Sequence, residues 1–474
     1  MKARKIVAIV LSVVLTITLF AGFQRLVMPK YMGDILEGNF TEEYYKETTK
    51  HDVIFVGDCE VYENFSPIAL WRDYGITSYV RGNAQQLIWQ SYYMLEDTLK
   101  YETPKVVIYN VQSLMHSEPQ KEEYNRMSLD GMKWSLTKVK AVQASMLEEE
   151  SFLDYVFPIL RYHSRITELD NNDIKYYFSK KKVTHNGYYM RVDTTLDTEA
   201  ANIVEESEDA VAEGDDTEND VEASADDFMD FEDFEDVEEY DEDSDEEFEE
   251  YEDEESPDNE IVEDANTTEI DNEFVEDSDT TEIDNDMEAS ADDFMDFEDF
   301  EDIEEYDGED EISDEELVEE VVDNTSPDDE KYKFGDYPME YLEKLRKLCE
   351  DKGIKLILVK APSLEPVWYN AYEVQVEEYA KKHNLTYINY LEKVEELQID
   401  YNYDSYDGGL HMNLNGAEKL SKDIGKVLVK DFGIKDHRGE KEYDGIYNEK
   451  LEFYNDMISK QKEEIKKYGK VVNY

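Results

Sequence analysis

One acidic segment sets the strongest limit on how this chain folds. Residues 201–330 contain 67 Asp and Glu residues and no Lys or Arg. Like charges at this density repel one another, and the apolar residues between them bury too little surface to offset the backbone entropy lost on folding, about 1–2 kcal/mol per residue. We therefore predict that residues 195–330 are a disordered insert, and that residues 31–194 and 331–437 together form one folded domain.

The insert also contains duplicated sequence. The 20 residues from Glu222, EASADDFMDFEDFEDVEEYD, recur from Glu288 with a single Val-to-Ile change, and TTEIDN occurs twice. Two copies without Gly or Pro turns do not form a solenoid, so the duplication indicates a low-complexity spacer. The alternative is a tract that docks a partner through Phe228, Phe231 and Phe234 or binds cations loosely. No EF-hand loop is present.

Outside residues 201–330 the chain has an ordinary charge balance. It holds 54 acidic and 47 basic residues there, a net charge of about −7, and it has no basic stripe of the kind that binds nucleic acid. The only two cysteines, Cys59 and Cys349, are too few for a disulfide framework, and we expect both to be unpaired. No metal or cofactor motif appears, so neither a metal nor a cofactor is expected.

An apolar run near the N-terminus is long enough to cross a membrane. Residues 6–23, IVAIVLSVVLTITLFAGF, carry no charge and span roughly 27 Å as a helix. Three of residues 1–5 are basic, which predicts a cytoplasmic tail at 1–5, a single-pass anchor in the cell membrane and an extracytoplasmic main domain. A cleaved signal peptide is the alternative, although Ala21-Gly22 is not a clean cleavage site, and it places the domain on the same side.

Short apolar runs alternate with helical patterns along the rest of the chain. Continuous β-branched runs indicate buried strands, and apolar residues repeating every three or four positions indicate amphipathic helices. Strands are expected at 52–57, 105–111, 354–362 and 385–390, and helices at 85–100, 341–352, 374–383 and 416–431. This order predicts an α/β domain with a mostly parallel sheet covered on both faces. Residues 438–474 are expected to form a charged helical tail, with an exposed helix over 447–467.

Cys59 directly follows the first predicted strand, in the sequence DVIFVGDCE. A nucleophile at a strand-to-helix turn is exposed and lies near helical backbone N–H groups, which favour an anion and lower the pKa of a thiol. The alternative is a small apolar cysteine buried at the end of a strand. The position makes Cys59 a candidate nucleophile.

A second candidate group lies near the C-terminus, in YDGGLHMN at 406–413. His411 follows Asp407 by four residues in a glycine-containing loop before a helix, which suits an imidazole oriented as a general base. Asp404 is a second carboxylate that could orient the ring. The alternative is a loop histidine that caps the helix.

Three further positions are candidate donors to an oxyanion. Gly82 follows the apolar stretch 78–80, and Asn110 and Gln112 end the strand expected at 105–111. A backbone N–H at a glycine and a side-chain amide are typical oxyanion donors. Asn and Gln also favour turns at strand ends, which is the alternative reason for their presence.

Together these blocks resemble the SGNH (GDSL-like) hydrolase superfamily over residues 31–194 and 332–437. VIFVGDCE resembles the nucleophile block, with Cys59 at the position of the usual serine. The later blocks are YVRGNAQQ with Gly82, VVIYNVQS with Asn110 or Gln112, and the final block with Asp407 and His411. The resemblance implies a three-layer, flavodoxin-like α/β fold. The anchor and the overall plan are similar to the D-alanyl-transfer and alginate-acetylation members, which work beside a membrane-bound O-acyltransferase.

Two departures from the family pattern bear on chemistry more than on fold. Cysteine replaces serine at position 59, and a thiol forms thioesters, although an imidazole placed for a hydroxyl need not activate it as well. The Asp–His spacing is four rather than three, because Gly408 occupies the usual Asp position.

The sequence predicts an esterase or O-acyltransferase that acts on a cell-envelope polysaccharide or teichoic polymer. Cys59 would be the nucleophile, His411 the base and Asp407 the group that orients it, with the oxyanion held by N–H groups of Cys59 and Gly82 and by Asn110 or Gln112. The expected partners are the polymer, the membrane and a membrane-bound O-acyltransferase. The alternatives are a non-catalytic binding or scaffold protein on the same fold, and a cation-binding or adhesion protein led by the acidic tract.

Aromatic residues outside these blocks suit two interpretations. The segment 123–135 holds Arg126 and Trp134, which favour a sugar or anionic-polymer site as much as a packed helix and loop. Trp368, Tyr369 and Tyr372 are more typical of packing than of a sugar platform.

Overall fold

The computed structural model describes residues 2–29, 37–119, 121–169, 171–178, 182, 184–198 and 332–472. Nearly all of the predicted insert, with its duplications and Phe228, Phe231 and Phe234, lies outside these residues. The folded part of the first half continues through residue 198, four residues past the predicted boundary. Thr195 is buried there, and its N–H donates to Ser405 O at 2.8 Å.

Five parallel strands form one sheet in the order β2-β1-β3-β4-β5. They are β1 (Val53–Gly57), β2 (Ser78–Gly82), β3 (Val106–Asn110), β4 (Lys355–Lys360) and β5 (Thr386–Asn389). The strand order reverses at β1 and β3, as in doubly wound sheets of the flavodoxin type, and such sheets bind ligands outside the carboxyl ends of the strands at that point. The prediction of an α/β fold with a parallel sheet is confirmed.

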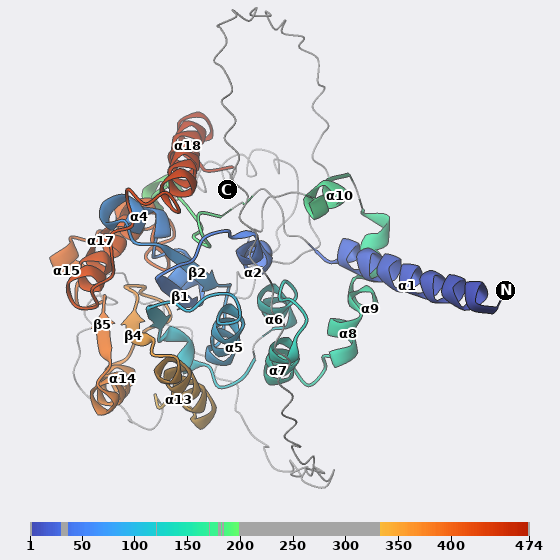
Figure 1. Cartoon of the computed structure of the whole chain (residues 1–474). Coiled ribbons are helices and arrows are strands. Elements are labelled where there is room, and N and C mark those ends of the chain that lie inside the picture. The colour runs from blue at the N-terminus through green and yellow to red at the C-terminus, as the bar shows by residue number, and fades with distance from the viewer. Residues whose placement is uncertain are drawn as a thin grey trace, which may run out of the picture. The chain divides into compact units, whose positions relative to one another are not determined.

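Side chains of alternate residues in each strand build a separate core on each face of the sheet. Ile54 and Val56 face one core and Val53 and Phe55 the other, as the two-residue period of a strand requires. The first core is covered by α5 (Ile88–Thr98), α7 (Leu136–Ser145), α13 (Asp336–Asp351) and α14 (Asn370–His383), and the second by α4 (Pro67–Tyr74) and α17 (Leu414–Lys430). Figure 1 shows these helices on opposite sides of the strands, which makes three layers.

Contacts between α4 and α17 join the two halves of the chain. Ser66 caps α4 by accepting from Ala69 N, and its own N–H donates to Ser421 Oγ at 2.7 Å. Asn413 caps α17 by accepting from the first N–H groups of that helix. The loop before α17 is therefore fixed against the segment that follows β1.

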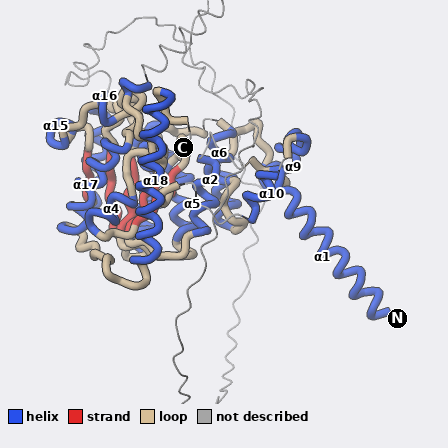
Figure 2. The backbone as a smooth tube through the Cα atoms, turned by 90° about the horizontal axis from the view of Figure 1, so that it is seen from above, coloured by secondary structure: helices blue, strands red, loops and turns tan. Residues whose placement is uncertain are grey.

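The C-terminal helix α18 (Asp444–Tyr468) differs from the prediction of an exposed helix, because one of its faces is buried. Tyr447, Tyr454 and Gln461, spaced seven residues apart, are fully buried on that face. Tyr447 stacks on Trp71 with ring centroids 4.2 Å apart, and Gln461 Nε2 donates to Met190 O at 3.0 Å. The helix packs on α4, as Figure 2 shows, so its charged residues cover only the opposite side.

Helix α1 (Lys2–Val27) is long and apolar enough to cross a membrane, and none of its apolar window is buried by the described residues. It contacts a set of short helices that precede the insert.

The remaining helices are α2 (Glu37–Glu43), η1 (Tyr44–Lys46), α3 (Cys59–Tyr62), η2 (Gln112–Met115), α6 (Glu122–Leu129), α8 (Phe152–Val156), α9 (Pro158–Tyr162), η3 (His163–Thr167), α10 (Asn171–Phe178), α15 (Val394–Leu397) and α16 (Tyr401–Asp404).

Candidate functional site

Cys59 lies at the carboxyl end of β1, where the strand turns into the single helical turn α3. Its side chain is partly exposed, whereas Cys349 is buried in α13, and both cysteines are free. The expectation of unpaired cysteines is confirmed, and Cys59 is the less buried of the two residues.

His411 and Asp407 are joined by two hydrogen bonds. Asp407 Oδ1 accepts from the backbone N–H of His411 at 2.8 Å, and Asp407 Oδ2 lies 2.7 Å from His411 Nδ1. A carboxylate only accepts, so Nδ1 is the protonated nitrogen of the ring. Asp404, the other carboxylate considered, instead accepts from Asp400 N and pairs with Lys419.

The glycines between Asp407 and His411 explain why a four-residue spacing works. Gly408 and Gly409 both have positive φ angles, 72° and 103°, which favour glycine. A Cβ at Gly409 would lie 2.8 Å from Leu364. The tight turn brings the Asp407 carboxylate back to the His411 ring.

The loop that carries His411 is held directly against the residues after Cys59. Asn64 Oδ1 accepts from Met412 N at 2.8 Å, and Tyr406 donates its hydroxyl to Glu63. Nε2 of His411 is buried and makes no hydrogen bond of normal geometry within the described residues. The Cys59 thiol nevertheless lies close enough for the thiol and the imidazole to shift each other's pKa.

Glu63 is a site residue that the sequence interpretation missed. Its Oε1 lies 3.8 Å from His411 Nε2, so carboxylates flank both nitrogens of the ring. Burial alone would lower the pKa of His411, but Glu63, the Cys59 thiol and Asp407 outweigh it, and the pKa is raised well above the ordinary value. Glu63 follows Cys59 by four residues, one helical turn, and that spacing was the available signal.

The thiol of Cys59 is harder to ionise than predicted. Burial and the carboxylates of Asp58 and Glu63 raise its pKa to about 11, against the opposing effect of His411. Helix α3 is only one turn long, so its dipole offers little compensation. The expectation of a lowered thiol pKa is wrong, and the thiol form of Cys59 is favoured at neutral pH.

The three candidate oxyanion donors have well-defined structural contacts. Gly82 pairs with Gly57 where β1 and β2 run close, and a Cβ there would lie 3.0 Å from Gly57 O. Asn110 donates to Glu60 at 2.8 Å and to Asp58 at 3.3 Å. Gln112 donates to Pro366 O at 3.2 Å. Both side-chain amides are engaged within the fold, so an oxyanion role would require them to exchange partners.

A buried charge network lies beneath Cys59 at the carboxyl ends of β3 and β4. Lys360, fully buried, lies 3.2 Å from Glu60, which is itself buried and also accepts from Asn110. Burial and the nearby Glu60 raise the pKa of Asp58 to about 7. The sequence interpretation missed this network, although a lysine that ends the apolar run IKLILVK was a visible anomaly.

The aromatic segments 123–135 and 368–372 pack mostly against other parts of the fold. Arg126 is buried over the Tyr155 ring at 3.7 Å from its centroid, and it pairs with Glu122 at 3.0 Å. Trp368 packs against Tyr372 and donates Nε1 to Glu373 at 2.8 Å. Neither set presents a free platform for a sugar, although Trp134 is half exposed.

Comparisons of this chain with protein-family models, with curated proteins and with solved structures found no match. The class that the fold defines is a doubly wound α/β protein with one apolar N-terminal helix. The resemblance to SGNH hydrolases is therefore carried by the quoted motifs alone.

Proposed function

We propose that this chain is a membrane-anchored, extracytoplasmic acyl-transfer enzyme of SGNH type, an esterase or O-acyltransferase with Cys59 as its nucleophile. The observation that supports it best is the convergence of Cys59 with the His411–Asp407 pair. These groups come from distant parts of the chain and meet beside the carboxyl end of β1, where the strand order reverses. That position is the usual ligand crevice of such sheets.

The reaction begins with attack of the Cys59 sulfur on the carbonyl carbon of an ester. An S–C bond forms, the C–O bond to the alcohol breaks, and the thiol proton passes through His411 Nε2 to the leaving oxygen. Asp407 keeps Nδ1 protonated and so directs Nε2 toward the thiol. Backbone N–H groups at Cys59 and Gly82 hold the oxyanion. Water or a polymer hydroxyl then accepts the acyl group from the thioester.

The substrate and location are the less direct part of the proposal. A cell-envelope polysaccharide or teichoic polymer, and a membrane-bound O-acyltransferase that supplies the acyl group, are implied by the motif resemblance. Helix α1 is consistent with a single-pass anchor that keeps the domain at the membrane surface.

The deciding experiment is to trap the acyl-enzyme. Full-length protein incubated with an activated acetyl ester and quenched in acid should carry one acetyl group on Cys59, which peptide mass spectrometry locates. Hydroxylamine should remove it, and Cys349→Ala should still form it because Cys349 is buried away from solvent. Absence of the adduct on Cys59 in the folded protein would refute the mechanism.

Two observations favour a second candidate, a non-catalytic binding protein on the same fold. The Asn110 amide is occupied, and the thiol is protonated at neutral pH because its pKa is raised to about 11. Binding of purified envelope polymer, with no acetyl adduct in the wild type and none in Cys59→Ser, would establish this function instead.

Glu63→Gln should shift the reactivity of Cys59 toward lower pH. Alkylation needs the Cys59 thiolate, and the Glu63 carboxylate opposes ionisation by raising the pKa of the thiol. Removing a charge within about 4–6 Å moves a pKa by about 1–3 units. Alkylation rates of Cys59 with iodoacetamide across pH measure the shift.

Glu452→Gln provides the matched control, because Glu452 is exposed on α18 and the change in net charge is the same. The control profile should coincide with that of the wild type. An unshifted profile for Glu63→Gln would show that Glu63 does not set the ionisation of the pair.

A further inference from the structure

A cavity of about 560 Å³ lies where α1 meets the folded part of the chain. Its walls include Ala21 near the end of α1, Met28 just after that helix, the loop 130–134 before α7, and Pro158. The rings of Phe20 and Phe157, just beside it, have centroids 6.4 Å apart. If α1 crosses a bilayer, this end of the helix lies at the depth of the lipid head groups.

The lining of the cavity carries an excess of positive charge. Four cationic and two acidic side chains contribute, and they are Arg25, Lys46, Lys133, Lys138, Glu42 and Asp130. Each carboxylate already has a cation nearby, since Glu42 pairs with Arg25 and Asp130 lies 3.5 Å from Arg126. The lining therefore carries two more positive than negative side chains, an excess that favours an anion.

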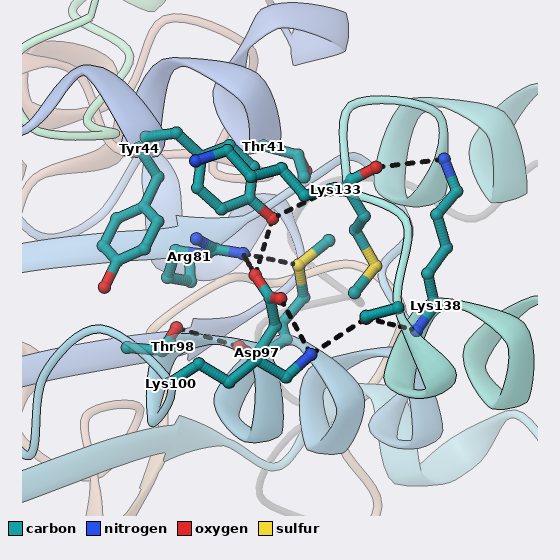
Figure 3. Close-up of polar contacts among 12 residues, drawn as sticks. Thr41, Tyr44, Arg81, Asp97, Thr98, Lys100, Lys133 and Lys138 are labelled. Atoms are coloured by element: carbon teal, nitrogen blue, oxygen red, sulfur yellow. Dashed lines mark hydrogen bonds and ion pairs between the residues drawn. The ribbon is translucent and has the colours of Figure 1, made fainter. Parts of the chain in front are cut away.

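Lys138 is the buried member of this set. Its Nζ donates to the carbonyl oxygens of Asp130 at 3.0 Å and Met132 at 3.1 Å, and it forms no ion pair within the described part of the chain. Figure 3 shows Lys138 donating to the loop that carries Lys133, whose own ammonium lies 4.2 Å from the centroid of the Tyr45 ring. An ammonium has three donors, so one remains for a ligand oxygen. A buried charge without a counterion gains from an anion beside it.

Exposed apolar side chains lie on and between α8 and α9, close in sequence to the cavity residues Val156 and Pro158. Leu153 and Leu160 are more than half exposed, and Phe157 and Trp134 are also exposed. Exposed apolar residues next to lysines and a tryptophan are typical of surfaces that lie in the membrane interface. A free anion would not contact these apolar side chains, whereas the acyl chains of a lipid would pack against them.

We propose that this cavity binds the phosphate head group of an anionic membrane lipid, with the acyl chains lying against α1 and the exposed residues of α8 and α9. Lys138 supplies a charge-assisted hydrogen bond to a phosphate oxygen, and the other basic side chains of the lining attract the head group at longer range. The site depends on α1 lying in the membrane and not on the chemistry of Cys59. It would hold the folded part of the chain in a fixed position on the bilayer.

The test uses the natural reporter Trp134, which lines the cavity. Full-length protein is placed in phosphatidylcholine nanodiscs that contain increasing fractions of either dibrominated phosphatidylglycerol or dibrominated phosphatidylcholine. Trp134→Phe identifies the fluorescence that belongs to this side chain. Stronger quenching by the anionic bromolipid is expected, and equal quenching by both lipids would overturn the proposal.

Single lysine variants assign the site. Lys133→Gln and Lys46→Gln should each lower the preference for the anionic lipid about fivefold, the usual effect of one basic residue near an anionic membrane. Lys140→Gln, exposed on α7 and outside the cavity lining, should keep the preference. A preference unchanged in both lysine variants would refute the site. Displacement of the bromolipid by inorganic phosphate would also refute it, because that identifies a phosphate site. None of these readouts depends on thioester formation.

Discussion

Alanine in place of His411 is expected to lower acyl-ester turnover by about two to four orders of magnitude, the usual contribution of a positioned general base. The thiol of Cys59 has its pKa raised to about 11, so few molecules hold a thiolate at neutral pH without the imidazole to accept the proton. Steady-state hydrolysis of a chromogenic ester by purified full-length protein measures the loss.

His437 is a matched control for this substitution. It is also a buried imidazole held by carboxylates, with Asp52 at 3.0 Å and Glu440 at 3.2 Å, but it lies away from Cys59. His437→Ala should lower stability while leaving turnover per folded molecule unchanged. Wild-type turnover in a folded His411→Ala protein would exclude the imidazole from the reaction.

Most strands that could be predicted from the sequence are those whose burial is nearly complete and apolar. β1, β3 and β4 read as continuous apolar runs because a central parallel strand is covered on both faces, whereas the edge strand β5 is only partly buried. β2 was recognised only as an apolar stretch, because its fourth residue is Arg81. That guanidinium is buried 4.0 Å from the centroid of the Tyr44 ring and 3.5 Å from Asp97, as Figure 3 shows, and such pairing is invisible in one sequence.

The short helices before the insert were not predicted for a different reason. Helices α8 and α9 contain five residues each, too few for an apolar period to repeat. Their positions come from packing on α1 and from the Arg126–Tyr155 contact. The buried face of α18 was predictable, because Tyr447, Tyr454 and Gln461 recur every seven residues.

The candidate site shows the same division between local and distant signals. Cys59, Asp407 and His411 were found because each lies in a short motif whose residues are close in sequence. Lys360 and Glu60 were missed because they are 300 positions apart and only the fold brings them together. The thiol pKa was wrongly predicted for the same reason, since burial and the carboxylates around Cys59 decide it.

The Glu60–Lys360 pair should account for the largest single loss of stability outside the core. Lys360 Nζ lies 3.2 Å from Glu60, and both side chains are almost completely buried. In Glu60→Ala the ammonium keeps its hydrogen bonds to the carbonyl oxygens of Ala361 and Ser363 but loses its ion pair. Removing one partner of a buried pair costs about 3–5 kcal/mol, because the remaining charge is left uncompensated in a low dielectric. Urea unfolding of the full-length protein in detergent measures the change.

An exposed ion pair of the same type provides the comparison. Glu340 and Lys344 on α13 lie 2.8 Å apart, but both are solvent-exposed, so Glu340→Ala should cost no more than about 0.5 kcal/mol. Glu60→Leu combined with Lys360→Met removes both charges and should recover much of the stability lost in Glu60→Ala, because no buried ion is left unpaired. If Glu60→Ala were no more destabilising than Glu340→Ala, the Lys360 ammonium would be solvated and the buried-charge argument would fail.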